Sequence, residues 1–331
     1  MTKVTKYTVD DELYGVRLDV YMKYAESEYS RSFFQRAIKD ERLTINGKVN
    51  ISPRTTVQLN DKIELSWPTL QSSKLCGEDI GLDILFEDEH IIVINKPPGL
   101  VVHPGAGHTS GTLVNALLNH NNEAFGSMVT EELRPGIVHR LDKDTSGVLI
   151  IGKSEFMVAK LSALFQERKT KKLYLALVHG FMNEPVGKMC NLIGRSSKNR
   201  KKMDIVERNG KEARTRYQVI AYNRNTSLVK VGIETGRTHQ IRVHMSSIKH
   251  PILGDELYGG KIALTHLEAP RQMLHAWRLR LKHPITGRMM RFEAPLPNDF
   301  LTVMDRANIH IEMPEQAATA IEIKEETPDN N

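Results

Sequence analysis

Hydrophobic and polar positions follow one pattern near the start of the chain and another further along. At the start, apolar residues recur with helical spacing in two consecutive stretches. Two alternating stretches follow, each around a turn signal, Asn-Gly in the first and Asn-Asp in the second, and each predicts a hairpin. These elements cover residues 15–25, 33–38, 43–49 and 56–65. Together they predict a compact helix-helix-hairpin domain over residues 12–70.

Strand patterns dominate the longer second part. Several segments alternate apolar with polar residues, which favours an antiparallel sheet with one face on a core. Helix candidates are too few to alternate with every strand, as a doubly wound fold requires. The predicted strands are 84–87, 90–95, 147–152, 173–179, 215–221, 227–234, 274–281 and 289–292, and the helices are 112–118, 155–165 and 238–248. We therefore predict an α+β domain with a mixed, mostly antiparallel sheet over residues 81–305, after a linker at 71–80.

Composition adds limits on the setting of the protein. The chain has 331 residues, of which 40% are hydrophobic and 26% charged, as expected for a globular protein of two domains. No stretch approaches eighteen consecutive apolar residues, and the first residues lack the apolar core of a secretory signal. The two cysteines, Cys76 and Cys190, are far apart. These features predict a cytoplasmic protein without a membrane span, and we expect a monomer.

Charge is unevenly distributed along the chain. The formal net charge is +6, yet residues 311–331 hold six acidic residues against Lys324 alone. We expect residues 306–331 to form a disordered acidic tail. The rest is more basic than the total suggests and would attract a polyanion such as RNA, although charge alone also fits a merely soluble surface. The candidate RNA-binding residues are Arg31, Arg36, Lys39, Arg195, Lys198, Arg200, Lys201 and Lys202.

A loop with two carboxylates is the first candidate for chemistry. The sequence HRLDKDTSG at 139–147 lies between apolar segments, and catalytic groups are common in loops between rigid strands. Taken alone, Arg140 and Asp142 fit a structural role in a turn at least as well. Residues 142–145 also match the Asp-x-Asp-x-Thr nucleophile of haloacid-dehalogenase-type phosphatases. His139 and Arg140 interrupt the apolar strand which that class requires, so we set this alternative aside.

Three further runs carry reactive or base-stacking side chains. KLYLALVHG at 172–180 places Lys172 and Tyr174 on one strand face. GRTHQIRVH at 236–244 predicts a turn that leads into a helix. HPILGDELYG at 250–259 predicts a constrained loop, for which a structural role is favoured. No metal site is predicted, because the cysteines form no pair motif and the two histidines of 236–244 are five residues apart.

In this order, and together with NKPPGLVVHP at 95–104, these runs resemble the RluA/RluD-type family of pseudouridine synthases. The resemblance covers about residues 84–295. Residues 15–66 resemble the small αL-type RNA-binding domain of the ribosomal protein S-four type. The matching positions in that domain are RLD at 17–19, SRS at 30–32, ING at 45–47 and Asp61.

The family resemblance implies a role for particular residues. Asp142 would be the catalytic aspartate, Arg242 its ion-pair partner, and Tyr174 the ring that stacks on the target uracil. Arg140 would fill the gap that an extruded nucleotide leaves in the RNA. The remaining implied substrate-binding residues are Ile241, Leu253 and Lys172.

The implied reaction is the isomerisation of uridine to pseudouridine, most simply in large-subunit ribosomal RNA. It exchanges no atoms with a second substrate, so we expect no cofactor. An ionised carboxylate could attack the sugar, attack the base, or remove a sugar proton, and the sequence leaves these three routes open. The competing hypothesis is a non-catalytic RNA-binding factor in ribosome assembly. It would leave Asp142, Tyr174 and Arg242 unexplained as a set.

Overall fold

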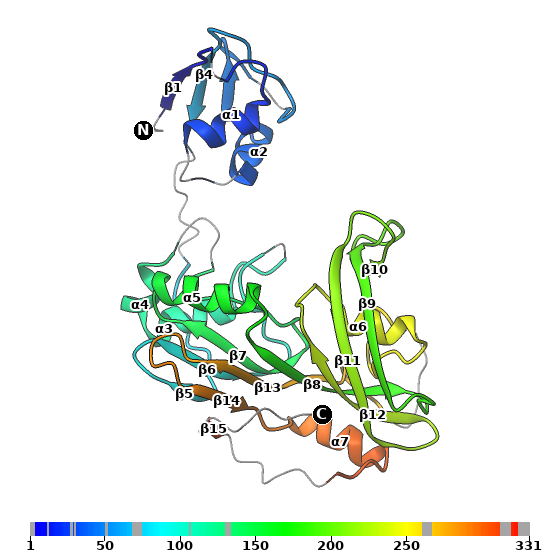
Figure 1. Ribbon diagram of the computed structural model, residues 1–331. Helices are drawn as coiled ribbons and strands as arrows, with labels where there is room; N and C mark the ends of the chain where they lie inside the picture. The colour runs from blue at the N-terminus through cyan, green and yellow to red at the C-terminus, as the bar shows by residue number, and fades with distance from the viewer. Residues whose placement is uncertain are drawn as a thin grey trace. The chain divides into compact units, whose positions relative to one another are not determined.

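The computed structural model describes most of the chain and divides it into two units. The described residues are 4–11, 13–26, 29, 31–49, 52–67, 75–105, 107–129, 134–259, 267–311 and 319–323. The first unit spans Met1–Lys74 and the second Leu75–Asn331, and Figure 1 shows both. Part of the predicted linker, residues 71–74, lies outside the described residues, whereas Leu75 packs against the core of the second unit.

The first unit packs two helices on a small antiparallel sheet. Helices α1 (Leu18–Ala25) and α2 (Arg31–Lys39) are amphipathic, and Leu18, Phe34 and Ile38 are fully buried. The sheet order is β1-β4-β2-β3. The strands are β1 (Val4–Thr8), β2 (Leu43–Ile45), β3 (Lys48–Val49) and β4 (Lys62–Ser66).

One of the two predicted hairpins is confirmed and the other is wrong. Strands β2 and β3 pair around Asn46 and Gly47, which both have positive φ as this tight turn requires. Residues 56–59 form no strand beside β4, apart from a bridge between Thr56 and Arg17. Strand β4 pairs instead with β2 and with β1. Alternation alone could not choose the partner of β4, because β1 lies more than fifty residues earlier.

The second unit is built on one long, mixed sheet, and the predicted fold class is confirmed. Its order is β10-β9-β11-β12-β8-β13-β7-β6-β5, with β14 and β15 continuing from β13. The pairing of β13 with β7 is parallel and the other pairings are antiparallel. The strands are β5 (Ile84–Glu87), β6 (Ile91–Lys96), β7 (Ser146–Gly152), β8 (Lys171–His179), β9 (Val186–Arg195), β10 (Met203–Ile205), β11 (Lys211–Tyr222), β12 (Thr226–Ile233), β13 (Leu274–Lys282), β14 (Met289–Glu293) and β15 (Thr319–Ile323).

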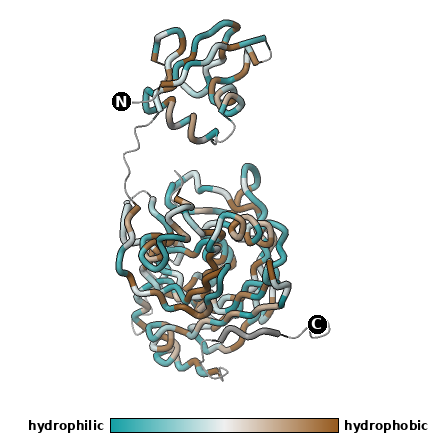
Figure 2. Tube along the Cα trace, turned by 90° about the vertical axis from the view of Figure 1, so that its left-hand side faces the viewer, coloured by the Kyte–Doolittle hydropathy of each residue, from teal (hydrophilic) through white to brown (hydrophobic). Residues whose placement is uncertain are grey.

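Helices lie on this sheet without alternating with its strands, which excludes the doubly wound alternative. Hydrophobic positions gather in the interior of the second unit in Figure 2. Leu149 of β7 and Leu175 and Leu177 of β8 are fully buried. In the described part of the chain no helix is both long and apolar enough to cross a membrane. The helices are α3 (Leu113–His120), α4 (Asn122–Gly126), α5 (Glu155–Gln166), α6 (Gln240–Ser247) and α7 (Asn298–Arg306).

The predicted acidic tail is only partly described. Residues 312–318 and 324–331 lie outside the described residues. Strand β15 falls within the stretch expected to be disordered, and it pairs antiparallel with β14. Ile309 is 3% exposed and packs in the core, and its backbone N–H donates to Met304 O at 2.9 Å. The expectation of disorder therefore does not describe residues 307–311 or β15.

Candidate active site

The loop before β7 and the turn before α6 line a common pocket with the middle of β8. The pocket has a cavity volume of about 100 Å³. It brings together segments that are far apart in the sequence. Its lining comprises Arg140, Leu141, Asp142, Thr145, Tyr174, Ile233, Gly236, Arg237, Thr238, His239, Gln240, Ile241, Arg242 and Leu274. Four of the sequence-predicted pocket residues meet Asp142 here, namely Tyr174, Arg242, Arg140 and Ile241.

Two basic side chains, Lys96 and Arg271, donate to backbone carbonyls of the loop that carries Asp142. The Lys96 ammonium donates to the carbonyl oxygens of Pro97, Leu100 and Lys143 at 2.7, 3.0 and 2.9 Å. These three acceptors match the three donors of an ammonium group, so the geometry favours the charged form although burial lowers the pKa of Lys96 to about 7. Arg271 donates to Asp144 O at 2.9 Å. The loop is therefore held at the two residues that directly follow Asp142.

Gly147, at the end of this loop, allows β7 to pass close to β13. Its φ is +113°, and a Cβ at this position would lie 2.2 Å from Ala276 O. Here β7 runs parallel to β13, with His275 opposite Ser146. Only glycine permits this close approach with a positive φ. The final glycine of the 139–147 motif thus serves the sheet geometry that presents Asp142.

The turn before α6 is organised by Gln240. Its side-chain amide donates to Arg214 O and to Thr215 Oγ1 at 3.0 Å, and its carbonyl oxygen accepts from Arg237 N at 3.0 Å. His239, just before the helix, has a left-handed φ of 56°. His239 and Arg242 are three positions apart, so they lie on one side of the helix start. Both side chains reach Asp142.

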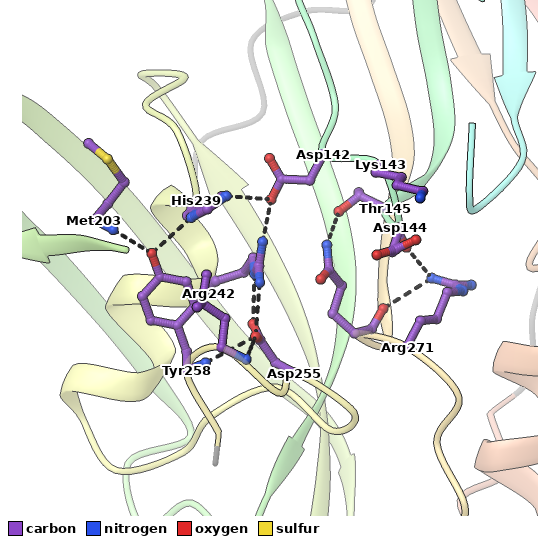
Figure 3. A network of polar contacts seen from close by, with 12 residues as sticks. Asp142, Lys143, Asp144, Thr145, Met203, His239, Arg242, Asp255, Tyr258 and Arg271 are labelled. Carbon is purple, nitrogen blue, oxygen red and sulfur yellow. Dashed lines mark hydrogen bonds and ion pairs between the residues drawn. The ribbon is translucent and has the colours of Figure 1, made fainter. Parts of the chain in front are cut away.

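Arg242 is the centre of the buried charge network in Figure 3. Its Nη1 donates to Asp142 Oδ2 at 3.0 Å, and its Nε and Nη2 donate to the two oxygens of Asp255 at 2.7 and 2.9 Å. Side-chain exposure is 8% for Arg242, 0% for Asp255 and 22% for Asp142. Burial alone would lower the pKa of Arg242, but the two carboxylates raise it above its usual value. Asp255 thus fixes the guanidinium by a bidentate pair, and the guanidinium presents one N–H to Asp142.

A second chain of contacts reaches Asp142 through His239. Met203 N donates to the Tyr258 hydroxyl at 2.7 Å, and that hydroxyl lies 2.8 Å from His239 Nδ1. A hydroxyl that accepts from Met203 can still either donate to Nδ1 or accept from it, so this contact fits both tautomers of the neutral ring. His239 Nε2 is 3.9 Å from Asp142 Oδ2. Burial lowers the pKa of His239, which favours this neutral form.

Apolar residues define the remaining walls. Tyr174 is 9% exposed and Ile241 is 4% exposed, and both face the pocket. Burial raises the pKa of the Tyr174 phenol, so the ring stays neutral. Leu253, expected beside the pocket, is not among its lining residues within the described chain. It is buried in the core, where its backbone pairs with Leu177 and Met273. Its contribution is to support the sheet, because its side chain belongs to the same core cluster as Tyr174.

Arg140 and Lys172 lie at a second, larger pocket of about 490 Å³ that adjoins the first. Arg140 is exposed and lines both pockets, whereas Lys172 lines the second one alone. Tyr174, Ile233, Gly236 and Arg237 are also shared by the two pockets.

The predicted RNA-facing cations are a mixed group. Arg31 donates to the buried Asp19 carboxylate at 2.8 Å, so it joins α2 to α1 and is not a purely solvated cation. Arg195 donates to Arg200 O at 2.8 Å and so closes the turn between β9 and β10. The side chain of Arg36 lies outside the described residues. Exposed cations of the set are Lys39, Lys198, Arg200 and Lys201, and Lys202 is partly buried with its Nζ 5.7 Å from the centre of the Tyr258 ring.

Four residues of the site were not predicted to be functional from the sequence, namely Lys96, His239, Asp255 and Tyr258. The sequence predicted only a structural role for Asp255, in a constrained loop. Asp255 does have a structural role, because it binds Arg242 and so fixes the residue that contacts Asp142. The signal for Asp255 and Tyr258 was their position in the fourth family-like run. No group of three or more histidine, cysteine or acidic side chains in the described part of the chain is arranged to hold a metal ion.

Comparison with known proteins matches both units. The family model described as RNA pseudouridylate synthase matches residues 90–247, and the S4 domain model matches residues 16–63. "Ribosomal large subunit pseudouridine synthase D" of Pseudomonas aeruginosa is 43% identical over 303 residues, which cover 88% of this chain and 92% of that protein. "Uncharacterized RNA pseudouridine synthase YlyB" of Bacillus subtilis is 37% identical over 90% of this chain and 96% of its own length.

A solved structure agrees with these relatives. The structure titled "Human RNA Pseudouridylate Synthase Domain Containing 1" superimposes with a TM-score of 0.53 and 28% identity, over 67% of this chain and 86% of that one. The S4 match confirms the expected ribosomal-protein-like domain in the first unit. The chain belongs to the family of RNA pseudouridine synthases, which isomerise uridine in RNA, and carries an S4 domain near its N-terminal end.

Proposed function

We propose that this enzyme isomerises uridines of large-subunit ribosomal RNA, with Asp142 as the catalytic carboxylate acting on an extruded nucleotide. The observation that carries the proposal is the 3.0 Å ion pair of Asp142 with the buried Arg242, beside Tyr174 in one pocket. A carboxylate that must act on a sugar or a base needs a fixed orientation, and the hydrogen bond from Arg242 supplies it. Relatives named for the large ribosomal subunit support the substrate.

Extrusion explains the rest of the pocket. The glycosidic bond inside a stacked RNA is out of reach, and extruding a nucleotide costs a few kcal/mol. Stacking of the uracil on Tyr174 returns about 1–3 kcal/mol of that cost. The exposed Arg140 is placed to enter the gap left in the RNA, and Ile241 closes the apolar side of the pocket. We also propose that the enzyme acts in the cytoplasm as a monomer.

The test uses RNA that carries tritium at the fifth carbon of uridine. That carbon becomes bonded to the ribose, so each isomerisation releases its tritium to solvent. The purified protein should release tritium from large-subunit ribosomal RNA, and much more slowly from small-subunit ribosomal RNA and from transfer RNA. Equal rates on all three would contradict the substrate assignment, and no release from any of them would contradict the activity.

The first unit is expected to add affinity through phosphate contacts. Lys39 and Arg31 expose positive charge on α2. Deleting residues 1–74 should weaken binding to large-subunit RNA and reduce the slope of log affinity against log salt by about 0.7–0.9 for each phosphate that this unit neutralises. Filter binding at several salt concentrations measures this slope. An unchanged slope would show that this unit makes no phosphate contact.

A further inference from the structure

The second pocket beside the active site is rich in positive charge. Arg140, Arg168, Lys172 and Arg237 line it, with Glu234 as the acidic residue among its lining. It shares Tyr174 with the catalytic pocket, so a strand of RNA whose target base lay against Tyr174 would continue into it.

Most of these charges already have partners. Arg168 pairs with Glu212 at 2.8 Å, and Arg237 donates its Nε to Glu212 O at 2.9 Å. The carboxylate of Glu234 is occupied by Arg216 at 3.0 Å and by Arg214 at 3.6 Å. The second pocket therefore offers no free carboxylate to a further cation.

Lys172 and the exposed Arg140 have no hydrogen bond or ion pair within the part of the chain that the structure describes, and of the two only Lys172 is partly buried. Its Nζ lies 5.5 Å from the centre of the Phe165 ring, which stacks in turn on His139 at 4.6 Å. Burial, and secondarily Arg237, lowers the pKa of Lys172 to about 8. A partly buried ammonium without a counter-charge is costly, and an anionic ligand would remove that cost.

The position of Lys172 indicates which anion. Lys172 and Tyr174 are two residues apart on β8, so their side chains leave the same face about 7 Å apart. The phosphates that flank a uridine are covalently joined to its own ribose, so a uracil stacked on Tyr174 brings them close to the neighbouring Lys172 side chain, which lines the same pocket.

We infer that Lys172 forms, with the adjoining cationic wall at Arg237, a binding site for the phosphodiester next to the extruded uridine. This inference rests on the proposed function. RNA binding then depends on a backbone phosphate that is held at a fixed distance from Tyr174. This phosphate contact sets the position of the RNA strand, so that one particular nucleotide enters the catalytic pocket.

Two neighbouring lysines give a matched test. Lys171 is exposed and points to the other face of β8. Replacing Lys172→Met should raise KM about 10-fold and reduce the salt slope by about 0.7–0.9, whereas Lys171→Met should change KM less than about twofold. Equal effects of the two replacements would overturn the inference, because they would reflect general charge only.

Substrates with a single neutral methylphosphonate linkage locate the phosphate that Lys172 binds. A neutral linkage on one side of the target uridine should weaken binding of the wild type about 10-fold and of Lys172→Met hardly at all, since that variant has no ammonium to pair with the phosphate. If a neutral linkage on either side of the uridine weakened binding of Lys172→Met as much as binding of the wild type, the two losses would be additive. Lys172 would then bind neither flanking phosphate. Wild-type tritium release on unmodified RNA serves as the control. If the wild-type protein releases no tritium, the proposed function is wrong. If it releases tritium and Lys172→Met binds and reacts like the wild type, only this inference is wrong.

The pH dependence provides a further readout. The charged groups that face Lys172 are Arg140, Arg168, Arg237 and Glu234, and Glu234 has two arginine partners. His139 is neutral, because burial lowers its pKa to about 3. Wild-type affinity for RNA should fall as the pH rises through about 8, where Lys172 loses its proton. Lys172→Arg keeps its charge and should flatten this fall, and an equally steep fall in that variant would contradict the assignment.

Discussion

Replacing Asp142→Asn should reduce tritium release from uridine-labelled RNA by at least about 10²-fold while leaving the dissociation constant for RNA within about twofold. The amide keeps the shape of the side chain and one acceptor for Arg242, but it can neither attack as an anion nor accept a proton. Single-turnover release and filter binding on the same RNA separate the chemical step from affinity.

Asp144 provides the matched control, because it lies in the same loop two residues away. Its backbone oxygen, and no side-chain oxygen, accepts from Arg271 at 2.9 Å. Asp144 is not among the residues that line the pocket, so Asp144→Asn should retain release within about threefold of the wild type. Undiminished release from Asp142→Asn, or an equal loss in both variants, would remove the distinction on which the assignment of Asp142 depends.

Replacing Asp255→Asn should both destabilise the protein and slow the reaction. Asp255 is fully buried and supplies two of the three carboxylate contacts of Arg242. Its removal leaves a buried guanidinium partly uncompensated, so the free energy of unfolding should fall by about 3–5 kcal/mol. Arg242 would also lose its fixed orientation toward Asp142, and a misplacement of about 1 Å can lower the rate about 10²-fold. Denaturant unfolding and single-turnover release measure the two effects.

Glu256 is the control for this change, since it is the next residue and is exposed. Glu256→Gln should alter the free energy of unfolding by less than about 0.5 kcal/mol and leave the rate unchanged. If Asp255→Asn were as stable and as active as Glu256→Gln, Arg242 would be held by something other than the bidentate pair.

Strands with a strong local signal could be predicted from the sequence, and those defined by distant partners could not. Strand β7 is buried along its whole length and β8 along most of it, so their apolar runs identify them. Strands β1 and β9 alternate between exposed and partly buried residues over much of their length, and they pair with β4 and β11 respectively. Their stability comes from those partners, which explains why the residue pattern missed them.

The same division holds for the site. Asp142 and Arg242 are 100 residues apart, so their ion pair could be inferred only from the family resemblance and not from spacing. The role of Asp255 depends on the path of the loop after α6, which no local pattern encodes. Arg31 shows the opposite case, in which a basic helix pattern suggested a free surface cation whereas the fold provides Asp19 as its partner. Charge patterns reveal the number of cations but not their partners.

The most direct measurement of the central proposal is a map of pseudouridine in the ribosomal RNA of cells that lack the gene. Our account predicts that specific large-subunit pseudouridines disappear, return when the wild-type protein is supplied, and remain absent when only Asp142→Asn is supplied. An unchanged large-subunit map, or full restoration by Asp142→Asn, would contradict it.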